Sequence, residues 1–199
     1  DVDLCFSCIN RLLVSHDLKP LDTLSQYREV FTFPIEEYYK RVGFDFDKIP
    51  FSMLAHEYME DYQEKSYACD LHSDVLDVVN KAKNLGFSQT VLSASKMDYL
   101  LKQMETLHVD DLFDSIYGIN DIYAKSKVEL AHAFKQTCSQ DDEIYFVGDS
   151  VHDYEVAKSI GAKCILVTTG HQNRATLESV NVPVMDSLME SLDLIYERD

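Results

Sequence analysis

The sequence predicts an α/β fold in which a parallel sheet carries helices on both faces, with a helical segment ahead of it. Residues 2–66 show only helical periodicity, whereas residues 72–196 alternate helical segments with short apolar runs. Such alternation is typical of parallel strands joined by crossover helices. At 199 residues the chain is long enough for this core and an additional small domain. We expect the two domains to span residues 1–68 and 69–199.

The first segment opens with apolar residues spaced by four, three and four along one helical face: Val2, Phe6, Ile9 and Leu13. Three prolines then stand at or near the starts of further helical segments: Pro20, Pro34 and Pro50. The same segment is rich in large apolar side chains: Tyr38, Tyr39, Phe51, Leu54, Tyr58 and Tyr62. We interpret these side chains as the core of a small helical bundle. The alternative is the wall of a substrate pocket.

The second segment contains helices and strands in regular succession, ending in an edge strand and a last helix. The expected helices are 72–86, 97–108, 126–135, 154–160, 174–180 and 187–196. The expected strands are 90–92, 115–119, 144–147, 164–167 and 182–185.

The chain is strongly acidic, with 35 acidic and 18 basic side chains and a net charge of −17. A charge of this sign repels nucleic acid and anionic membranes, so neither is an expected partner. No apolar run approaches the ~20 residues that span a bilayer, and we recognise no signal peptide. The five cysteines include one Cys-x-x-Cys pair without a second pair, so we expect reduced thiols in a cytoplasmic protein rather than a zinc site.

Two aspartates follow the apolar run 144–147, four residues apart, at Asp149 and Asp153. In an open parallel sheet, ligands bind outside the carboxyl ends of the strands, where these side chains are expected. Two neighbouring carboxylates repel each other unless a cation lies between them, and their oxygens are ligands that Mg²⁺ prefers. The pair therefore predicts a Mg²⁺ site, with a helix cap as the alternative.

Polar residues also follow two other predicted strands. Ser93, Ala94 and Ser95 come directly after residues 90–92, where a hydroxyl and backbone N–H groups can hold a phosphate. Serines at such positions are also common turn and cap residues. Lys127 or Lys125 opens the helix after strand 115–119, where a lysine opposes the helix dipole. Neutralising a phosphate is one reason for a lysine there, and solvent exposure is the other.

In this order, these segments resemble the haloacid dehalogenase superfamily, in particular its phosphoglycolate phosphatase and beta-phosphoglucomutase-like members. The resemblance implies a Rossmann-like core with an inserted helical-bundle cap and a Mg²⁺-dependent phosphatase acting on a small phosphorylated metabolite. It also implies that Ser93 and the Ala94 N–H, beside Ser95, bind phosphoryl oxygens with Lys127, and that Asp149 and Asp153 hold Mg²⁺. In such a site Ser93 and Lys127 are catalytic. Phosphoglycolate-like esters are the default substrates for this type of cap, and phosphomutase activity is an alternative.

The resemblance fails at the front of the chain. The family's first motif is a strand ending in Asp-x-Asp-Gly-Thr, which supplies the nucleophile and the acid/base. Here Asp1 and Asp3 instead resemble acidic residues that open a helix. We therefore expect the nucleophile to lie upstream of Asp1 and the first, central strand to be missing. This predicts a gap between strands 90–92 and 144–147.

Three further alternatives follow from the residues. A chain without a nucleophile could be an inactive protein that binds phosphate and Mg²⁺ or acts as an interaction module. Gly148-Asp149-Ser150 is similar to a lipase/esterase signature with a serine nucleophile, although no Asp-x-x-His follows it. Three cationic side chains of the first segment could meet an anionic leaving group or be solvated: Arg28, Lys40 and Arg41.

Overall fold

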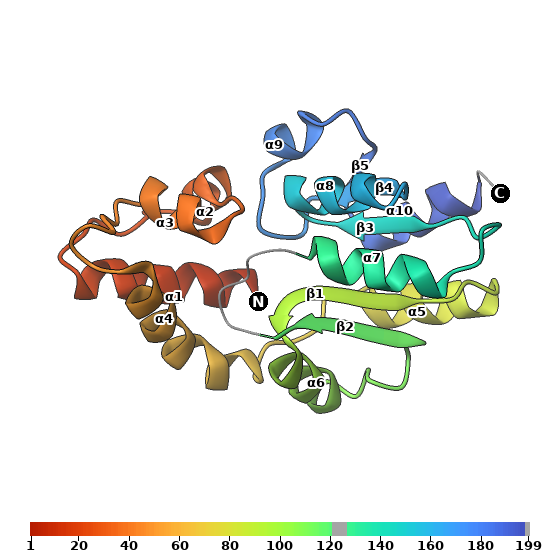
Figure 1. Cartoon of the computed structure of the whole chain (residues 1–199), viewed down its shortest axis with the longest axis horizontal. Coiled ribbons are helices and arrows are strands. Elements are labelled where there is room, and N and C mark those ends of the chain that lie inside the picture. The colour runs from red at the N-terminus through yellow and green to blue at the C-terminus, as the bar shows by residue number, and fades with distance from the viewer. Residues whose placement is uncertain (121–126, 198–199) are drawn as a thin grey trace.

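The computed structural model describes residues 1–120 and 127–197. Four helices form one end of the molecule, and the alternating helices and strands form the other (Figure 1). The helices α1 to α4 are Val2–Ser15, Leu24–Val30, Ile35–Arg41 and Phe51–Ser66. The start of α1 lies between the two ends of the molecule (Figure 1).

The apolar face predicted for the first helix is present in α1, where Val2, Ile9 and Leu13 are buried. Two of the three prolines mark helix starts as predicted, because Pro34 and Pro50 are the N-cap residues of α3 and α4. A proline fits there because the first N–H groups of a helix have no intrahelical acceptor.

One hydrophobic cluster joins the four helices. Tyr27, Tyr38, Tyr39 and Leu54 lie in its centre and are 0–3% exposed. The interpretation as a bundle core is confirmed, and the alternative of a pocket wall also applies, because five of the six predicted side chains line a cavity: Tyr38, Tyr39, Phe51, Tyr58 and Tyr62. The boundary at residue 68 between two domains stays a prediction.

The rest of the chain follows the predicted order of elements. The helices are α5 Val75–Asn84, α6 Met97–Thr106, α7 Val128–Thr137, α8 Val151–Ser159, α9 Arg174–Glu178 and α10 Leu188–Tyr196. The strands are β1 Thr90–Lys96, β2 Ser115–Ile119, β3 Tyr145–Gly148, β4 Lys163–Val167 and β5 Val184–Met185. Three elements have an end that differs from the prediction by three residues or more: β1 continues through the serines expected to follow it, α8 begins three residues earlier, and α5 begins three residues later.

The strands are parallel, and they form two sheets, as a missing central strand predicts. β1 pairs with β2, and β3, β4 and β5 form a three-stranded sheet with β5 at its edge. Within the described residues, no ladder joins β1 to β3. The predicted gap is therefore confirmed. Val147 of β3 is 37% exposed and β1 is half-buried along its whole length, as expected beside an unfilled position.

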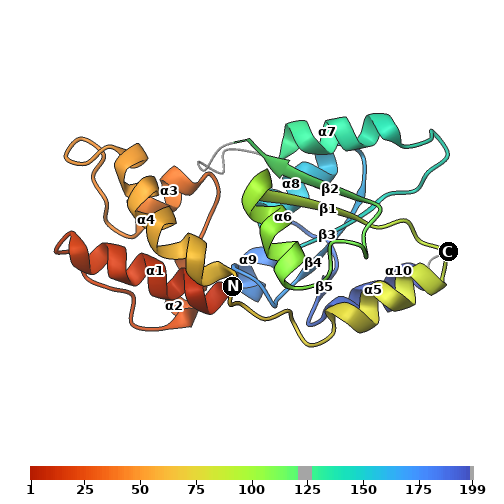
Figure 2. The ribbon, with the colours of Figure 1, turned by 90° about the horizontal axis from the view of Figure 1, so that it is seen from below.

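Helices cover both faces of the strands, as predicted. α7 and α8 lie on one face and α5 and α10 on the other (Figure 2). On the first face, Ala131, Val156 and Ile160 form a cluster that contacts both Leu92 of β1 and Phe146 of β3. The two sheets therefore share a hydrophobic core although no backbone hydrogen bonds connect them.

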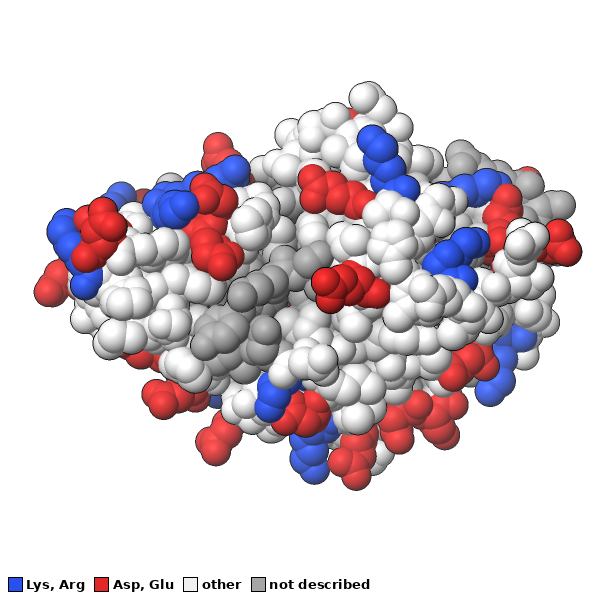
Figure 3. All heavy atoms as spheres, viewed as in Figure 1, with Lys and Arg blue, Asp and Glu red and all other residues white. Residues whose placement is uncertain are grey.

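The structure shows charged side chains of both signs on the surface and cysteines without disulfide bonds. On the face shown in Figure 3, acidic and basic side chains lie interspersed at both ends of the molecule. All five cysteines are free thiols. No helix in the described ranges is both long and apolar enough to cross a membrane.

Candidate functional site

The turn between β3 and α8 carries the two predicted metal ligands, and a capping box organises it. Ser150 is the N-cap of α8, and its Oγ accepts a hydrogen bond from the Asp153 N–H at 3.2 Å. In return, Asp153 Oδ2 accepts from the N–H groups of Asp149 and Ser150, both at 3.0 Å, and from the Ser150 hydroxyl at 2.7 Å. Such a cap stabilises a helix by about 1 kcal/mol. Asp153 therefore does cap the helix, as the alternative interpretation expected.

Gly148 makes room for this turn. A Cβ on Gly148 would lie 2.3 Å from the Asp153 Cβ, which is closer than atoms can approach. The glycine at the end of β3 is thus required by space, because the Asp153 side chain folds back against the strand.

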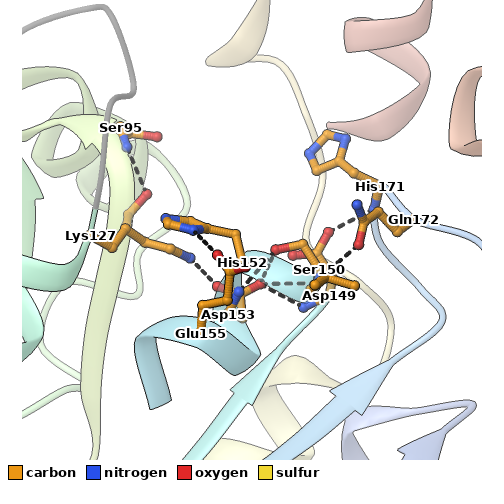
Figure 4. Close-up of polar contacts among 11 residues, drawn as sticks. Ser95, Lys127, Asp149, Ser150, His152, Asp153, Glu155, His171 and Gln172 are labelled. Atoms are coloured by element: carbon orange, nitrogen blue, oxygen red, sulfur yellow. Dashed lines mark hydrogen bonds and ion pairs between the residues drawn. The ribbon is translucent and has the colours of Figure 1, made fainter. Parts of the chain in front are cut away.

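Lys127 and Asp153 form an ion pair at the base of the site (Figure 4). Lys127 is the N-cap of α7, and its side chain is 12% exposed while that of Asp153 is 2% exposed. Burial raises the pKa of Asp153, but the Lys127 charge and the hydrogen bonds from Lys127, Ser150 and the Asp149 N–H outweigh it, so the pKa lies below its usual range. The Asp153 carboxylate is the counter-charge that explains why a lysine stands at a helix N-terminus, where it opposes the helix dipole.

Asp149 is held by the loop that follows β4. The His171 N–H donates to Asp149 Oδ2 at 2.7 Å (Figure 4). A Cβ on Gly170 would lie 1.9 Å from the same oxygen, so only glycine allows this approach. The loop and the β3–α8 turn together fix the direction of the Asp149 carboxylate.

The serines predicted to bind phosphate lie in an irregular end of β1. The register pairs Leu92 with Tyr117 and Lys96 with Ile119, so β1 has two more residues than β2 over this interval. The extra residues form a bulge, a feature that redirects side chains and frees backbone groups. Within it the Ser95 N–H donates to Ser93 Oγ at 3.1 Å.

A cavity of about 360 Å³ brings these groups together between the helical end and the strands. The predicted site residues all line it: Ser93, Ala94, Ser95, Lys127, Asp149 and Asp153. Lys125, the alternative to Lys127, lies outside the described residues. The other wall of the cavity comes from α1 to α4 and is largely aromatic.

His171 is a site residue that sequence reasoning missed. Its Nδ1 lies 2.8 Å from the Tyr27 hydroxyl, and its ring stacks on Phe31 at 4.7 Å between centroids. Burial lowers the pKa of His171, more than the charge of Asp149 raises it. A lone histidine in a loop carries no sequence signal for these contacts, which form only when α2 lies against the loop.

The N-terminal residues Asp1 and Cys5 also line the cavity. Asp1 is the N-cap of α1 and Asp3 lies in its first turn, which confirms their interpretation as helix-opening residues. The Tyr62 hydroxyl donates to Asp1 Oδ2 at 2.5 Å. Asp1, Cys5 and His171 bring potential ligand atoms within 4.8 Å of one another. Burial raises the pKa of Cys5 to about 11, so this thiol is protonated at neutral pH when no metal is bound.

The donor set fits a hard cation held at Asp149. Asp153 Oδ1 pairs with Lys127 and Oδ2 accepts hydrogen bonds from the β3–α8 turn, so Asp153 orients the turn, and its role as a second metal ligand stays a prediction. Mg²⁺ is commonly bound by one or two carboxylates, with water and substrate phosphate completing its shell. Asp149 at the carboxyl end of β3 meets this requirement.

The serine-nucleophile alternative does not fit the geometry. Ser150 is 2% exposed, and its hydroxyl donates to Asp153 Oδ2 while accepting from the Asp153 N–H. A hydroxyl used in this way is not available to attack an ester.

Comparison with known proteins agrees with the observed fold. The sequence profile described as haloacid dehalogenase-like hydrolase matches residues 1–167. Phosphoglycolate phosphatase 1 of Pseudomonas aeruginosa is 23% identical over 139 residues, which cover 68% of this chain and 51% of that protein. The chain thus spans about half the length of this curated relative.

Solved structures show the same fold at low identity. A haloacid dehalogenase-like hydrolase from Streptococcus pneumoniae superposes with a TM-score of 0.82 at 18% identity, covering 98% of this chain and 92% of that one. CbbY from Rhodobacter sphaeroides, solved with phosphate, gives 0.66 at 16% identity over 94% and 88% of the two chains. With the profile match over most of its length, the chain belongs to the haloacid dehalogenase-like hydrolase family.

Proposed function

We propose that the protein is a Mg²⁺-dependent phosphatase that hydrolyses a small phosphomonoester. One observation carries the proposal. A single cavity is lined by a lysine, a bulged strand end with two serines, and the carboxylate of Asp149. These are a cation, hydrogen-bond donors and a metal ligand, which are the groups that phosphoryl transfer uses to stabilise charge.

The bulge and the lysine bind the phosphate in this proposal. Ser93, Ala94, Ser95 and Lys127 all line the cavity. The Lys127 ammonium, held by Asp153, is available to a phosphate oxygen on its cavity side. Together these groups neutralise the equatorial oxygens and hold the phosphorus in line for attack.

Asp149 holds the cation, and Asp153 fixes the turn that positions Asp149. Bound Mg²⁺ supplies a positive charge that screens the repulsion between the phosphate and an attacking carboxylate. The His171 N–H and the close approach of Gly170 keep the Asp149 carboxylate in one orientation, so little reorganisation is needed when the cation binds.

The nucleophile in this proposal is an aspartate upstream of Asp1, as the family resemblance implies. Its carboxylate attacks phosphorus, the ester oxygen leaves as an alcohol after taking up a proton, and water then cleaves the aspartyl phosphate to release phosphate. The residues described above bind the same phosphoryl group in both steps.

The test is hydrolysis of p-nitrophenyl phosphate by the full-length protein, with Mg²⁺ and with EDTA. We expect turnover that EDTA abolishes. We also expect Lys127→Met to lower kcat/KM by about 10²–10³-fold, as for other groups that stabilise transition-state charge. Lys102→Met, on an exposed face of α6, is the control that keeps full activity. Absence of turnover in the full-length protein would favour the inactive, phosphate-binding alternative.

A further inference from the structure

We propose that the leaving group of the substrate is an uncharged aromatic alcohol that carries a hydrogen-bonding group, rather than a small anionic acid. The inference rests on the proposed phosphatase function. It comes from the cavity wall that faces the phosphate-binding groups, which is built by α1 to α4 and the residues that join them.

The charge of this wall excludes an anionic leaving group. Asp1 is the one charged residue that residues 1–66, all of them described, contribute to the cavity. Arg28 donates to the Gly170 carbonyl at 3.0 Å, and Lys40 pairs with Glu37 at 2.6 Å. Neither these cations nor Arg41 line the cavity, so none is available to a substrate there.

The described cations that line the cavity lie on the opposite wall. Lys127, which pairs with Asp153, is the cation assigned to the phosphate, and Lys96 lies 2.7 Å from Asp98. A carboxylate on a leaving group that faces the α1–α4 wall would meet the like charge of Asp1 and no cation of that wall, which disfavours an anionic group. An uncharged leaving group avoids this cost.

The shape and chemistry of the wall favour an aromatic ring. The Tyr58 and Tyr62 rings stack with centroids 5.8 Å apart and planes 17° apart, and Tyr38 meets Tyr27 edge to face at 5.9 Å. All four rings line the cavity. Aromatic pairs in stacked or edge-to-face geometry gain energy beyond the area they bury, so an aryl group is a better match than an aliphatic chain.

One hydroxyl in this wall has no partner. Tyr38 is 3% exposed, and its Oη is one of two buried side-chain polar atoms in the described chain without a hydrogen bond. The hydroxyls of Tyr27 and Tyr62 are used by His171 and Asp1. Buried polar groups are rarely left unpaired, so Tyr38 Oη is the group that a hydroxyl or carbonyl on the ring would satisfy.

Binding of non-hydrolysable phosphonates tests the inference without needing catalysis. The probes are benzylphosphonate, 4-hydroxybenzylphosphonate and phosphonoacetate, titrated calorimetrically into the full-length protein with Mg²⁺. We expect benzylphosphonate to bind at least ten-fold more tightly than phosphonoacetate. Equal or tighter binding of phosphonoacetate, or no binding of either aryl probe, overturns the inference.

Tyr38→Phe tests the hydrogen bond. We expect the native protein to prefer 4-hydroxybenzylphosphonate over benzylphosphonate about ten-fold and the variant to show no preference. Because the hydroxyl is unpaired, its removal should leave the unfolding midpoint in urea unchanged or raised, which separates binding from folding. The same preference in both proteins overturns this role for Tyr38.

Adding a cation to the cavity wall gives a positive control, because it should favour an anionic leaving group. Met59 of α4 lines the cavity, whereas Met53 on the same helix is 54% exposed and does not. We expect Met59→Arg to tighten phosphonoacetate binding about ten-fold and Met53→Arg to leave it unchanged. Equal effects of the two variants would contradict the assignment of the wall. Phosphate release from p-nitrophenyl phosphate or phosphoglycolate tests the phosphatase function separately, so one proposal can fail while the other stands.

Discussion

Lys127 at the start of α7 and Asp153 in the first turn of α8 form a buried ion pair that joins two helix N-termini beneath the cavity. The carboxylate also accepts three hydrogen bonds from its own turn, so one side chain anchors both the lysine and the backbone beside Asp149. In the proposed function, phosphate binding and metal binding therefore depend on the same pair.

Loss of this pair should destabilise the protein in a pH-dependent way. Lys127→Met leaves a buried carboxylate without its cation, so we expect the free energy of unfolding at pH 7 to fall by about 3–5 kcal/mol. The pKa of Asp153 is depressed in the folded protein. Its contribution is therefore present above the unfolded-state value of about 3.9 and is lost as pH falls through the folded pKa.

Urea unfolding measures this effect. The difference between native protein and variant should be constant above about pH 6 and shrink as the pH falls from about 5 toward 3. Lys19→Met removes an ion pair whose lysine is 81% exposed and should cost about 0–1 kcal/mol. A Lys127→Met effect as small as that of Lys19→Met would show that the pair is not buried in solution.

Mg²⁺ should stabilise the native protein through Asp149. A ligand that binds only the folded state raises the free energy of unfolding, so saturating Mg²⁺ should raise the melting temperature. We expect Asp149→Asn to abolish this shift because it removes the proposed metal-binding charge. Asp98→Asn, an exposed acidic residue at the start of α6, should keep the shift. Retention of the shift in Asp149→Asn would place the cation elsewhere.

Gly170→Ala should impair the site by crowding alone. The added Cβ would fall 1.9 Å from Asp149 Oδ2, so the carboxylate must move, and we expect the Mg²⁺-induced rise in melting temperature to disappear. Gly161→Ala is the matched control, since a Cβ there meets no atom within 4 Å. Its φ of +71° makes alanine strained, so it should lower stability by about 1–2 kcal/mol but keep the Mg²⁺ response. Equal Mg²⁺ responses in the two variants would contradict the crowding argument.

The gap between the sheets should be visible in amide hydrogen exchange. The Lys163 N–H donates to the Ile144 carbonyl, so by alternation the N–H groups of Tyr145 and Val147 point away from β4 toward β1. We expect them to exchange at least about ten-fold faster than those of Ile165 and Leu166 in β4, which pairs on both sides. Equal protection in this chain would indicate that the edge of β3 is covered.

Most of the elements could be predicted from the sequence because their signals are local. Apolar periodicity placed β2 at its observed bounds, and the gap beside β3 followed from the missing first motif. The end of β1 and the start of α8 could not be placed from periodicity. Ser93 to Ser95 extend the strand only because β2 offers a partner for Lys96. Asp153 enters α8 only because Ser150 caps it.

The candidate site also has a part that the sequence predicted and a part that only the structure shows. Residue type and position after a predicted strand drew attention to Ser93, Lys127 and Asp149, and the family resemblance then selected them, with Lys125 left as the alternative to Lys127. The partners of these residues depend on contacts between distant segments. The contact of His171 with Asp149, and that of Tyr27 with His171, join residues 22 and 144 positions apart.

The amino-acid order alone thus determined the type and succession of the elements, the acidic charge, and the residues proposed to bind phosphate and metal, since each of these is a property of short stretches of chain. Tertiary structure alone decided that Lys127 forms an ion pair with Asp153 and that Gly170 lies close to the Asp149 carboxylate. It also decided that the α1–α4 wall of the cavity is aromatic and without a basic residue. These features arise from the packing of α1 to α4 against the loops after β3 and β4. A local sequence pattern does not show which side chains line a cavity that forms between distant segments.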